Sequence, residues 1–213
     1  MTAEGTLARD ETGALLARLR AALRGALPGM KAQELMMPSI RRLESFDRPA
    51  WRKAAVLILL YPVDGKLYFP LTLRGEDLLH HAGQVSLPGG SLERGESAEE
   101  AALRETSEEI GVDPSRVEML GRLSPLKIPP SGFEIEPFVG SIPFRPAFVP
   151  EEGEVADIIE APFSLLSSDE AFAVEEWELK NGRSSVPFWT IGGHKVWGAT
   201  AMVLAELAAI ARG

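Results

Sequence analysis

The sequence predicts an α+β domain, in which strands and a few helices follow one another without a strict repeat. One observation behind this prediction is an apolar run of strand length at 53–61, which is followed by the hairpin-turn signal Asp64-Gly65. A second is the recurrence of apolar residues at helical spacing near both ends of the chain, at 11–27 and 197–211. With 213 residues, 45% of them apolar, the chain is long enough to build one sizeable core.

The N-terminal part is expected to contribute one amphipathic helix and a connector. Leucines recur at intervals of three or four residues and Pro28-Gly29 ends the pattern, which predicts a helix over roughly 11–27. Residues 28–52 are predicted to form an irregular connector. We expect residues 1–52 to be part of the same domain as residues 53–213.

The rest of the chain predicts strands with a few helices between them. The run at 53–61 is predicted to be a strand, and 67–73 its hairpin partner. A helix is predicted near 96–110. The elements predicted after it are strands at 117–126 and 133–144, a short helix at 161–166, strands after 171 divided by the turns Asn181-Gly182 and Gly192-Gly193, and a last helix at about 197–211.

Charge and composition narrow the classes of partner. The formal net charge of −9 argues against a nucleic acid as the main partner, because nucleic-acid binding rests on basic patches. The absence of cysteine excludes a disulfide framework and thiolate chemistry. The start of the chain lacks the pattern of a signal peptide, and no run approaches the roughly 18 apolar residues of a membrane span. We therefore expect a soluble cytoplasmic protein that binds no membrane and handles small phosphate compounds.

The most informative segment, residues 90–112, reads GSLERGESAEEAALRETSEEIGV. Three of its carboxylates, Glu105, Glu108 and Glu109, stand at positions i, i+3 and i+4, so in a helix all three project from one face within one turn. Like charges at this spacing repel one another. A hard divalent cation such as Mg²⁺ takes oxygen ligands and would remove that repulsion.

The predicted helix of this segment has signals at both ends. Ser97 and the acidic residues after it suit the start of a helix, and Gly111 suits its end. An arbitrary helix rich in Glu and Arg would simply form a solvated acidic face, braced here by Arg104. The glycines and the distant Glu96, all at fixed offsets, favour a functional site instead.

This spacing resembles the Nudix box, the signature of hydrolases that cleave a nucleoside diphosphate linked to another group. The shared pattern starts at Gly90 and reads G-x5-E-x7-R-E-x2-E-E-x-G, followed by an aliphatic residue. Thr106 stands where the family usually has an aliphatic residue, and its methyl group can still pack. The resemblance implies a Nudix-type α/β/α sandwich, with a mixed β-sheet between helices.

The resemblance also implies a role for each polar residue of the box. It implies Glu105, Glu108 and Glu109 as metal ligands and catalytic groups. The implied cofactor is Mg²⁺ or Mn²⁺. The glycine loop with Gly89 and Gly90 would cradle the metals and bind the pyrophosphate of the substrate. Arg104 would pair with Glu96, so that both would be structural.

Residues 71–90, LTLRGEDLLHHAGQVSLPGG, look like an extra motif of the coenzyme A pyrophosphatase branch of this family. In that motif a Leu-Thr-x-Arg strand end leads through His-x-Gly-Gln-Val to Phe-Pro-Gly-Gly. Arg74 and His81 match it and are implied as substrate-binding residues. Leu87 replaces the usual Phe, and Leu79 stands where Arg is common.

The C-terminal segment 196–201, VWGATA, also resembles that branch, so the resemblance covers about 53–210. Taken alone, these residues have simpler interpretations. Arg74 is as typical of a surface charge as of a ligand, and Trp197 is predicted to pack in the core rather than to stack on a ligand. We expect no zinc site at His80-His81, because adjacent side chains point apart on most backbones.

The resemblance implies hydrolysis of the pyrophosphate of coenzyme A to 3′,5′-ADP and 4′-phosphopantetheine, with CoA derivatives as further candidates. A carboxylate would take the proton of the attacking water, either a box glutamate or Glu154 in the acidic segment 151–155. A solvated acidic loop is the alternative for that segment. One alternative for the whole protein is an ADP-ribose or dinucleotide pyrophosphatase. A more remote alternative is an inactive nucleotide-binding sensor, and the intact set of three glutamates argues against it. The expected partner is thus a small molecule. The sequence does not indicate whether the protein is a monomer or an oligomer.

Overall fold

The computed structural model describes residues 3–43, 50–75, 83–180 and 182–212. The α-helices in these ranges are α1 (Ala3–Ala22), α2 (Met30–Gln33), α3 (Ala98–Ile110) and α4 (Gly198–Arg212). The 3₁₀ helices are η1 (Glu34–Met36), η2 (Ser39–Leu43), η3 (Pro114–Arg116), η4 (Phe163–Ser167) and η5 (Asp169–Ala171). None of the described helices combines the length and the apolar character that crossing a membrane requires.

The strands form a large and a small sheet. The strands of the large sheet are β1 (Arg52–Val63), β2 (Lys66–Arg74), β3 (Val85–Ser86), β4 (Gly89–Ser91), β5 (Glu118–Arg122), β6 (Leu126–Ile128), β7 (Phe133–Ser141) and β8 (Val155–Pro162). The small sheet contains β9 (Phe172–Leu179), β10 (Gly182–Ile191) and β11 (His194–Trp197). Both contain antiparallel hairpins, including the two predicted at Asp64-Gly65 and Gly192-Gly193. Strands β9 and β10 also pair antiparallel, while Asn181 of the turn predicted between them lies outside the described residues.

Strand β1 is the centre of the large sheet. It pairs antiparallel with β2 and β4, and parallel with β7, so the sheet is mixed as predicted. The tight turn into β2 uses Asp64 and Gly65 at φ 46° and 75°, which is the left-handed conformation that an Asp-Gly hairpin turn requires. On the other side of β2 lies β8, and β3 pairs antiparallel with Thr72 and Leu73 near the end of β2.

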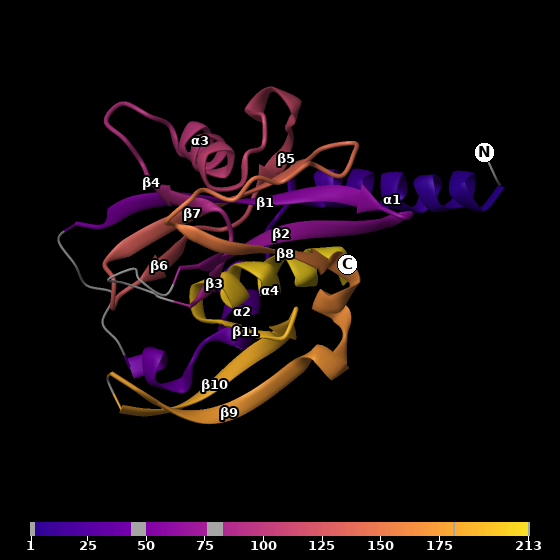
Figure 1. Ribbon diagram of the computed structural model, residues 1–213. Coiled ribbons are helices and arrows are strands. Elements are labelled where there is room, and N and C mark those ends of the chain that lie inside the picture. The colour runs from indigo at the N-terminus through magenta and orange to yellow at the C-terminus, as the bar shows by residue number, and fades with distance from the viewer. Residues whose placement is uncertain (1–2, 44–49, 76–82, 181, 213) are drawn as a thin grey trace.

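The large sheet is covered by helices on both faces (Figure 1). Leu57 and Tyr61 of β1 belong to the same buried cluster as Ala102 and Ile110 of α3. The residues between them, such as Ile58, point the other way and belong to the cluster that contains α4. Burial on both faces explains why β1 is a continuous apolar run rather than an alternating one. The predicted α/β/α sandwich is confirmed.

A further layer lies outside the prediction. The small sheet packs on the far side of α4, so that α4 lies between two sheets (Figure 1). Residues 201–208 of α4 are all buried, and they include residues on every side of the helix. The composition of this helix, apolar all round rather than on one face, is typical of a helix enclosed in this way.

The N-terminal elements differ from their prediction. Helix α1 spans Ala3–Ala22 rather than 11–27. The Gly25 N–H bonds to the Ala22 carbonyl, only three residues back, so the chain tightens into a 3₁₀ turn at the glycine and leaves the helix before Leu27. The connector is more regular than predicted, since α2, η1 and η2 all lie within it.

Two later elements also differ. The strand predicted at 117–126 is divided into β5 and β6, because the Ser124 N–H donates to the carboxylate of Glu206 on α4, at 3.2 Å, rather than to a neighbouring strand. The short helix predicted at 161–166 begins later than expected. Its first two residues pair with β2 as the end of β8, and the residues after them form η4.

Candidate active site

Helix α3 has a well-defined start and end. The Ser97 hydroxyl accepts a hydrogen bond from the Glu100 N–H, and the Glu100 carboxylate accepts one from the Ser97 N–H at 2.8 Å, which is a complete capping box. The helix ends at Gly111, which adopts the left-handed conformation at φ 72°. Both ends therefore fix which side chains of α3 face the sheet.

Thr106 lies on the inner side of α3. It is buried, and its hydroxyl donates to the Ala102 carbonyl one turn earlier, at 2.7 Å. This bond satisfies the polar group, so threonine can occupy a position at which the Nudix pattern usually has an aliphatic side chain.

Two glycines lie directly beneath the glutamates of α3. A side chain on Gly89 would place its Cβ 2.2 Å from the Ala55 carbonyl oxygen, and one on Gly90 would lie 2.5 Å from the Glu105 carboxylate. At Gly89 only a residue without a side chain allows this approach, because the opposing atom belongs to the backbone, whereas a side chain at Gly90 would displace the Glu105 carboxylate. The predicted glycine loop is partly a strand, β4, whose pairing with β1 holds the two backbones under the helix.

Glu109 is the most buried carboxylate of the site, with 4% of its side chain exposed. The Gly89 N–H donates to its Oε2 at 3.2 Å, and Nη1 of Arg74 lies 3.9 Å from its Oε1. Burial raises the pKa of Glu109 to about 7, and these two groups lower it only in part. Burial also raises the pKa of Glu105.

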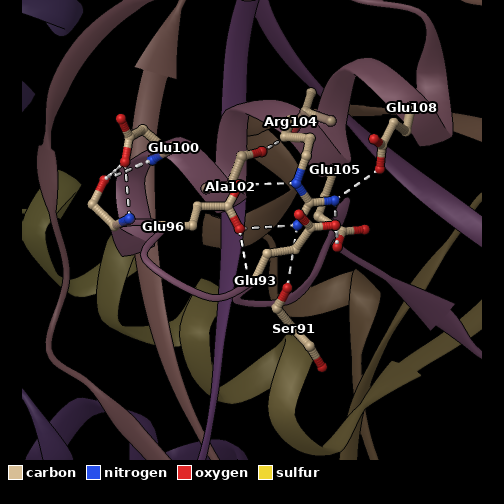
Figure 2. A network of polar contacts seen from close by, with 10 residues as sticks. Ser91, Glu93, Glu96, Glu100, Ala102, Arg104, Glu105 and Glu108 are labelled. Carbon is tan, nitrogen blue, oxygen red and sulfur yellow. Dashed lines mark hydrogen bonds and ion pairs between the residues drawn. The ribbon is translucent and has the colours of Figure 1, made fainter.

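Arg104 binds several oxygen atoms at the outer edge of the site (Figure 2). It donates to both carboxylate oxygens of Glu96, at 2.8 and 3.1 Å, and to the Ser91 carbonyl at 3.2 Å. Its Nη1 also lies 3.0 Å from Glu105 and 2.8 Å from Glu108, whose side chain is 52% exposed. The pairing with Glu96 is the contact that the resemblance implied.

Glu154 approaches from another part of the chain, the β7–β8 loop (residues 142–154). The negative charge of Glu154 contributes to the raised pKa of both Glu105 and Glu109, so the three carboxylates are electrostatic neighbours. Its backbone is held at the end of β2, because the Gly75 N–H donates to the Glu154 carbonyl at 3.1 Å. The loop thus adds a fourth carboxylate to the site.

The structure brings together most of the residues that the sequence indicated. Arg74, Gly89, Gly90 and the glutamates of α3 converge, whereas His81 lies outside the described residues. The Ser91 carbonyl was not foreseen as a partner of Arg104. It contributes a backbone atom, which no residue type in the sequence could have signalled.

The donor atoms suit a hard divalent cation. Among the described residues, no three His, Cys, Asp or Glu side chains already surround a common point. The reason is that Glu105 and Glu108 turn toward Arg104, while Glu109 turns toward Gly89. Carboxylate oxygens are nevertheless the ligands that Mg²⁺ prefers, and a bound cation would stabilise the charged form of Glu109, whose pKa is raised mainly by burial.

Comparison with known proteins agrees with this site. Residues 51–180 match the NUDIX domain family. The chain is 41% identical over 165 residues to NudL of Pectobacterium atrosepticum, an uncharacterized Nudix hydrolase, covering 74% of this chain and 81% of that protein. It is 36% identical over 167 residues to the chloroplastic Nudix hydrolase 22 of Arabidopsis thaliana, covering 75% of this chain and 55% of that protein.

The fold comparison points the same way. A MutT/nudix family protein from Enterococcus faecalis superposes with a TM-score of 0.50 at 15% identity, over 79% of this chain and 64% of that one. At this level of identity the comparison supports the shared fold alone. Together with the family match and the relatives, these findings show that the chain belongs to the Nudix hydrolases and is a pyrophosphohydrolase.

Proposed function

We propose that the protein hydrolyses the pyrophosphate of coenzyme A to 3′,5′-ADP and 4′-phosphopantetheine, with Mg²⁺ or Mn²⁺ as cofactor. One observation carries the choice of substrate. Arg74, from the motif that resembles the coenzyme A pyrophosphatase branch, lies 3.9 Å from Glu109 of the Nudix box. The substrate motif and the box therefore meet at one place, and a basic side chain is available there for phosphate oxygens.

The side chains of the site have complementary tasks in this proposal. Glu105, Glu108 and Glu109 would hold the divalent cations, which neutralise phosphate oxygens and lower the pKa of a bound water. Glu154 would accept the proton of the attacking water. Arg74 would bind a phosphate of the substrate, and Gly89 and Gly90 leave room for the pyrophosphate to approach the backbone.

The test is a substrate panel with product identification. Purified protein would be given coenzyme A, ADP-ribose or a dinucleoside polyphosphate, each with Mg²⁺ and with Mn²⁺, and the products would be separated by chromatography. Coenzyme A should show the highest kcat/KM and give equal amounts of 3′,5′-ADP and 4′-phosphopantetheine. A Glu109→Gln variant, in which a metal ligand is lost, should lower kcat at least about 100-fold.

Other outcomes of the panel would reject the proposal in distinct ways. A preference for ADP-ribose or for the dinucleotide would show that the substrate is wrong while the enzyme class stands. Turnover by Glu109→Gln at the parent rate would show that Glu109 is no metal ligand. Binding of nucleotides without cleavage, under every condition, would favour a nucleotide sensor.

A further inference from the structure

The β7–β8 loop, which carries Glu154, is stiff and is anchored where it begins. The Ile142 N–H donates to the Leu60 carbonyl of β1 at 3.0 Å. Three residues of the loop are prolines, namely Pro143, Pro146 and Pro150. Because each proline fixes one φ angle, the loop has few ways to absorb a displacement between its anchor points.

Near its start the loop is tied to the sheet by three polar side chains, Arg145, Glu160 and Tyr61, which we call the Glu160 clamp. Arg145 donates to both carboxylate oxygens of Glu160, with Nε at 2.9 Å, and the Tyr61 hydroxyl donates to the same carboxylate at 2.9 Å. Phe148 of the loop packs edge-on against the Tyr61 ring, with centroids 5.4 Å apart. An isolated surface ion pair fixes little, but a bidentate pair backed by a buried phenol has a defined geometry.

Further along, the loop lies on the C-terminal end of α3. The Val149 N–H donates to the Ile110 carbonyl at 3.1 Å, and the Glu151 N–H donates to the Glu109 carbonyl at 3.0 Å. A side chain on Gly111 would place its Cβ 2.9 Å from Cβ of Val149, so the glycine also makes room for the loop. The loop is therefore bonded through its backbone to the same residue whose side chain lies in the site.

The closing turn of the loop connects this contact to Glu154. The Val155 N–H donates to the Glu151 carbonyl at 3.1 Å, which forms a tight turn over residues 151–155. At its other side the turn is bonded to Gly75, next to Arg74. A shift of the loop on α3 would consequently move Glu154 relative to Glu105 and Glu109.

We propose that the Glu160 clamp is a positioning device, in which Arg145, Glu160 and Tyr61 hold the β7–β8 loop on the end of α3 and thereby hold Glu154 beside the metal-binding glutamates. The part that concerns Glu154 rests on the function proposed above. The charge states agree with this role, since the hydrogen bond from Arg145 lowers the pKa of Glu160 and burial raises the pKa of Tyr61. Near neutral pH the carboxylate is thus an acceptor and the phenol a donor.

Amide hydrogen exchange tests whether the clamp holds the loop. In Arg145→Ala and in Tyr61→Phe, exchange at the Val149 and Glu151 amides should become about ten times faster, because these amides lose protection when the loop leaves α3. Arg145→Lys should recover part of the protection. The matched control is Arg183→Ala, which removes a surface ion pair with Glu176 on the small sheet and should leave these amides unchanged. Unchanged exchange in both clamp variants would overturn the proposal.

Steady-state kinetics tests whether the clamp acts through Glu154. With the best substrate of the panel, Arg145→Ala should lower kcat about 10- to 100-fold, with KM and the metal concentration needed for half-activity unchanged, since only the position of one reacting group is altered. In a Glu154→Gln background the same change should have almost no further effect on kcat. A full additional loss in that background, or a normal kcat despite faster exchange, would overturn the positioning role.

The same measurements separate this inference from the proposed function. If Glu154→Gln alone kept the parent kcat, Glu154 would not be the proton acceptor, and the clamp could not position it for that task. If the protein preferred another substrate, the kinetics of the variants would be measured with that substrate, and the comparison between variants would remain valid. The exchange rates would still decide whether the clamp holds the loop.

Discussion

Glu109 is an acid placed where its charge is costly unless a cation is present. Its pKa rises from an ordinary 4.5 to about 7 because the side chain is buried. Below pH 4.5 the group is protonated whether the chain is folded or unfolded, so its titration does not change the free energy of unfolding. Between pH 4.5 and 7 the unfolded chain releases the proton and the folded chain keeps it, so stability falls as the pH rises. Above pH 7 the loss is complete.

The buried carboxylate of Glu109 should therefore destabilise the metal-free protein at alkaline pH. At pH 8, with a chelator present, Glu109→Gln should be more stable than the parent by up to about 3 kcal/mol, and near pH 5 the difference should largely disappear. Urea denaturation of both proteins at the two pH values measures it. Glu99→Gln, an exposed change in the first turn of the same helix, is the control and should show no such trend. A stability difference that is the same at both pH values would contradict the assignment.

Arg74 is the residue on which the choice of substrate depends. If it binds a phosphate or polar group that coenzyme A alone presents, Arg74→Ala should lower kcat/KM for coenzyme A by roughly 10- to 100-fold, because a lost charge-assisted hydrogen bond costs about 1.5–3 kcal/mol. Slow cleavage of ADP-ribose should fall much less. Since both substrates are measured on one variant, general damage to the fold cannot imitate the difference. An equal loss of kcat/KM for both substrates would instead mean that Arg74 binds the pyrophosphate that they share. The proximity of Arg74 to Glu109 would explain that result.

Helix α3 and β4 form one unit through Arg104, which connects the helix to Glu96 and to the Ser91 carbonyl. Arg104→Ala should lower the melting temperature by at least about 3 °C and weaken Mn²⁺ binding, since the glutamates lose their common partner. Arg104→Lys should recover only part of both, because an ammonium group cannot replace the bidentate contact. Thermal unfolding and a Mn²⁺ titration would provide the two values. If neither changed, Arg104 would be a surface residue of an acidic helix.

The elements that sequence predicted well are those specified by neighbouring residues. The box helix was expected near 96–110 and runs from Ala98 to Ile110, because Ser97, Glu100 and Gly111 define its ends locally. The hairpin at Asp64-Gly65 is equally local. The break at Ser124 is different, since its cause is a carboxylate 82 positions away in sequence. No local pattern could have indicated it.

The same distinction holds for the candidate site. The spacing of Glu105, Glu108 and Glu109 gave their common helix face, and the glycine pattern gave their neighbours. Their environments differ, however, and these depend on the packing of distant elements. Glu109 is buried against β4, whereas Glu108 reaches toward solvent and Arg104. Which carboxylate has the strongly raised pKa could therefore be learned only from the fold.

At the scale of the whole molecule, α4 is the element around which the chain is assembled. It lies between the two sheets and contacts α1, α2 and η1 as well. The sequence indicated this helix but not its surroundings, because its uniform apolar composition does not say which elements cover it. The small sheet was predicted as hairpins, and its place beyond α4 is a matter of tertiary packing.

One polar group on α4 also connects the N-terminal segment to the rest. The carboxylate of Glu206 is fully buried and accepts hydrogen bonds from Gly29 N–H at 3.0 Å, from the Gln33 side chain at 2.9 Å and from the Ser124 hydroxyl at 2.7 Å. Leu19 belongs to the same core cluster as α4. These contacts support the prediction that residues 1–52 fold together with the domain.

The prediction can be tested at Glu206. Glu206→Ala removes the acceptor of several buried donors at once, so it should lower the free energy of unfolding by at least about 3 kcal/mol, while the exposed change Glu178→Ala on β9 should have little effect. Because the donors come from both the N-terminal segment and the β5–β6 region, unfolding should remain a single transition.

Hydrogen exchange in the parent protein gives the second readout. If residues 1–52 are part of the domain, the amides of α2 should exchange as slowly as those of β1 near the global limit. Exchange of α2 that is orders of magnitude faster, with β1 still protected, would mean that the N-terminal segment opens independently and that the domain proper begins at β1.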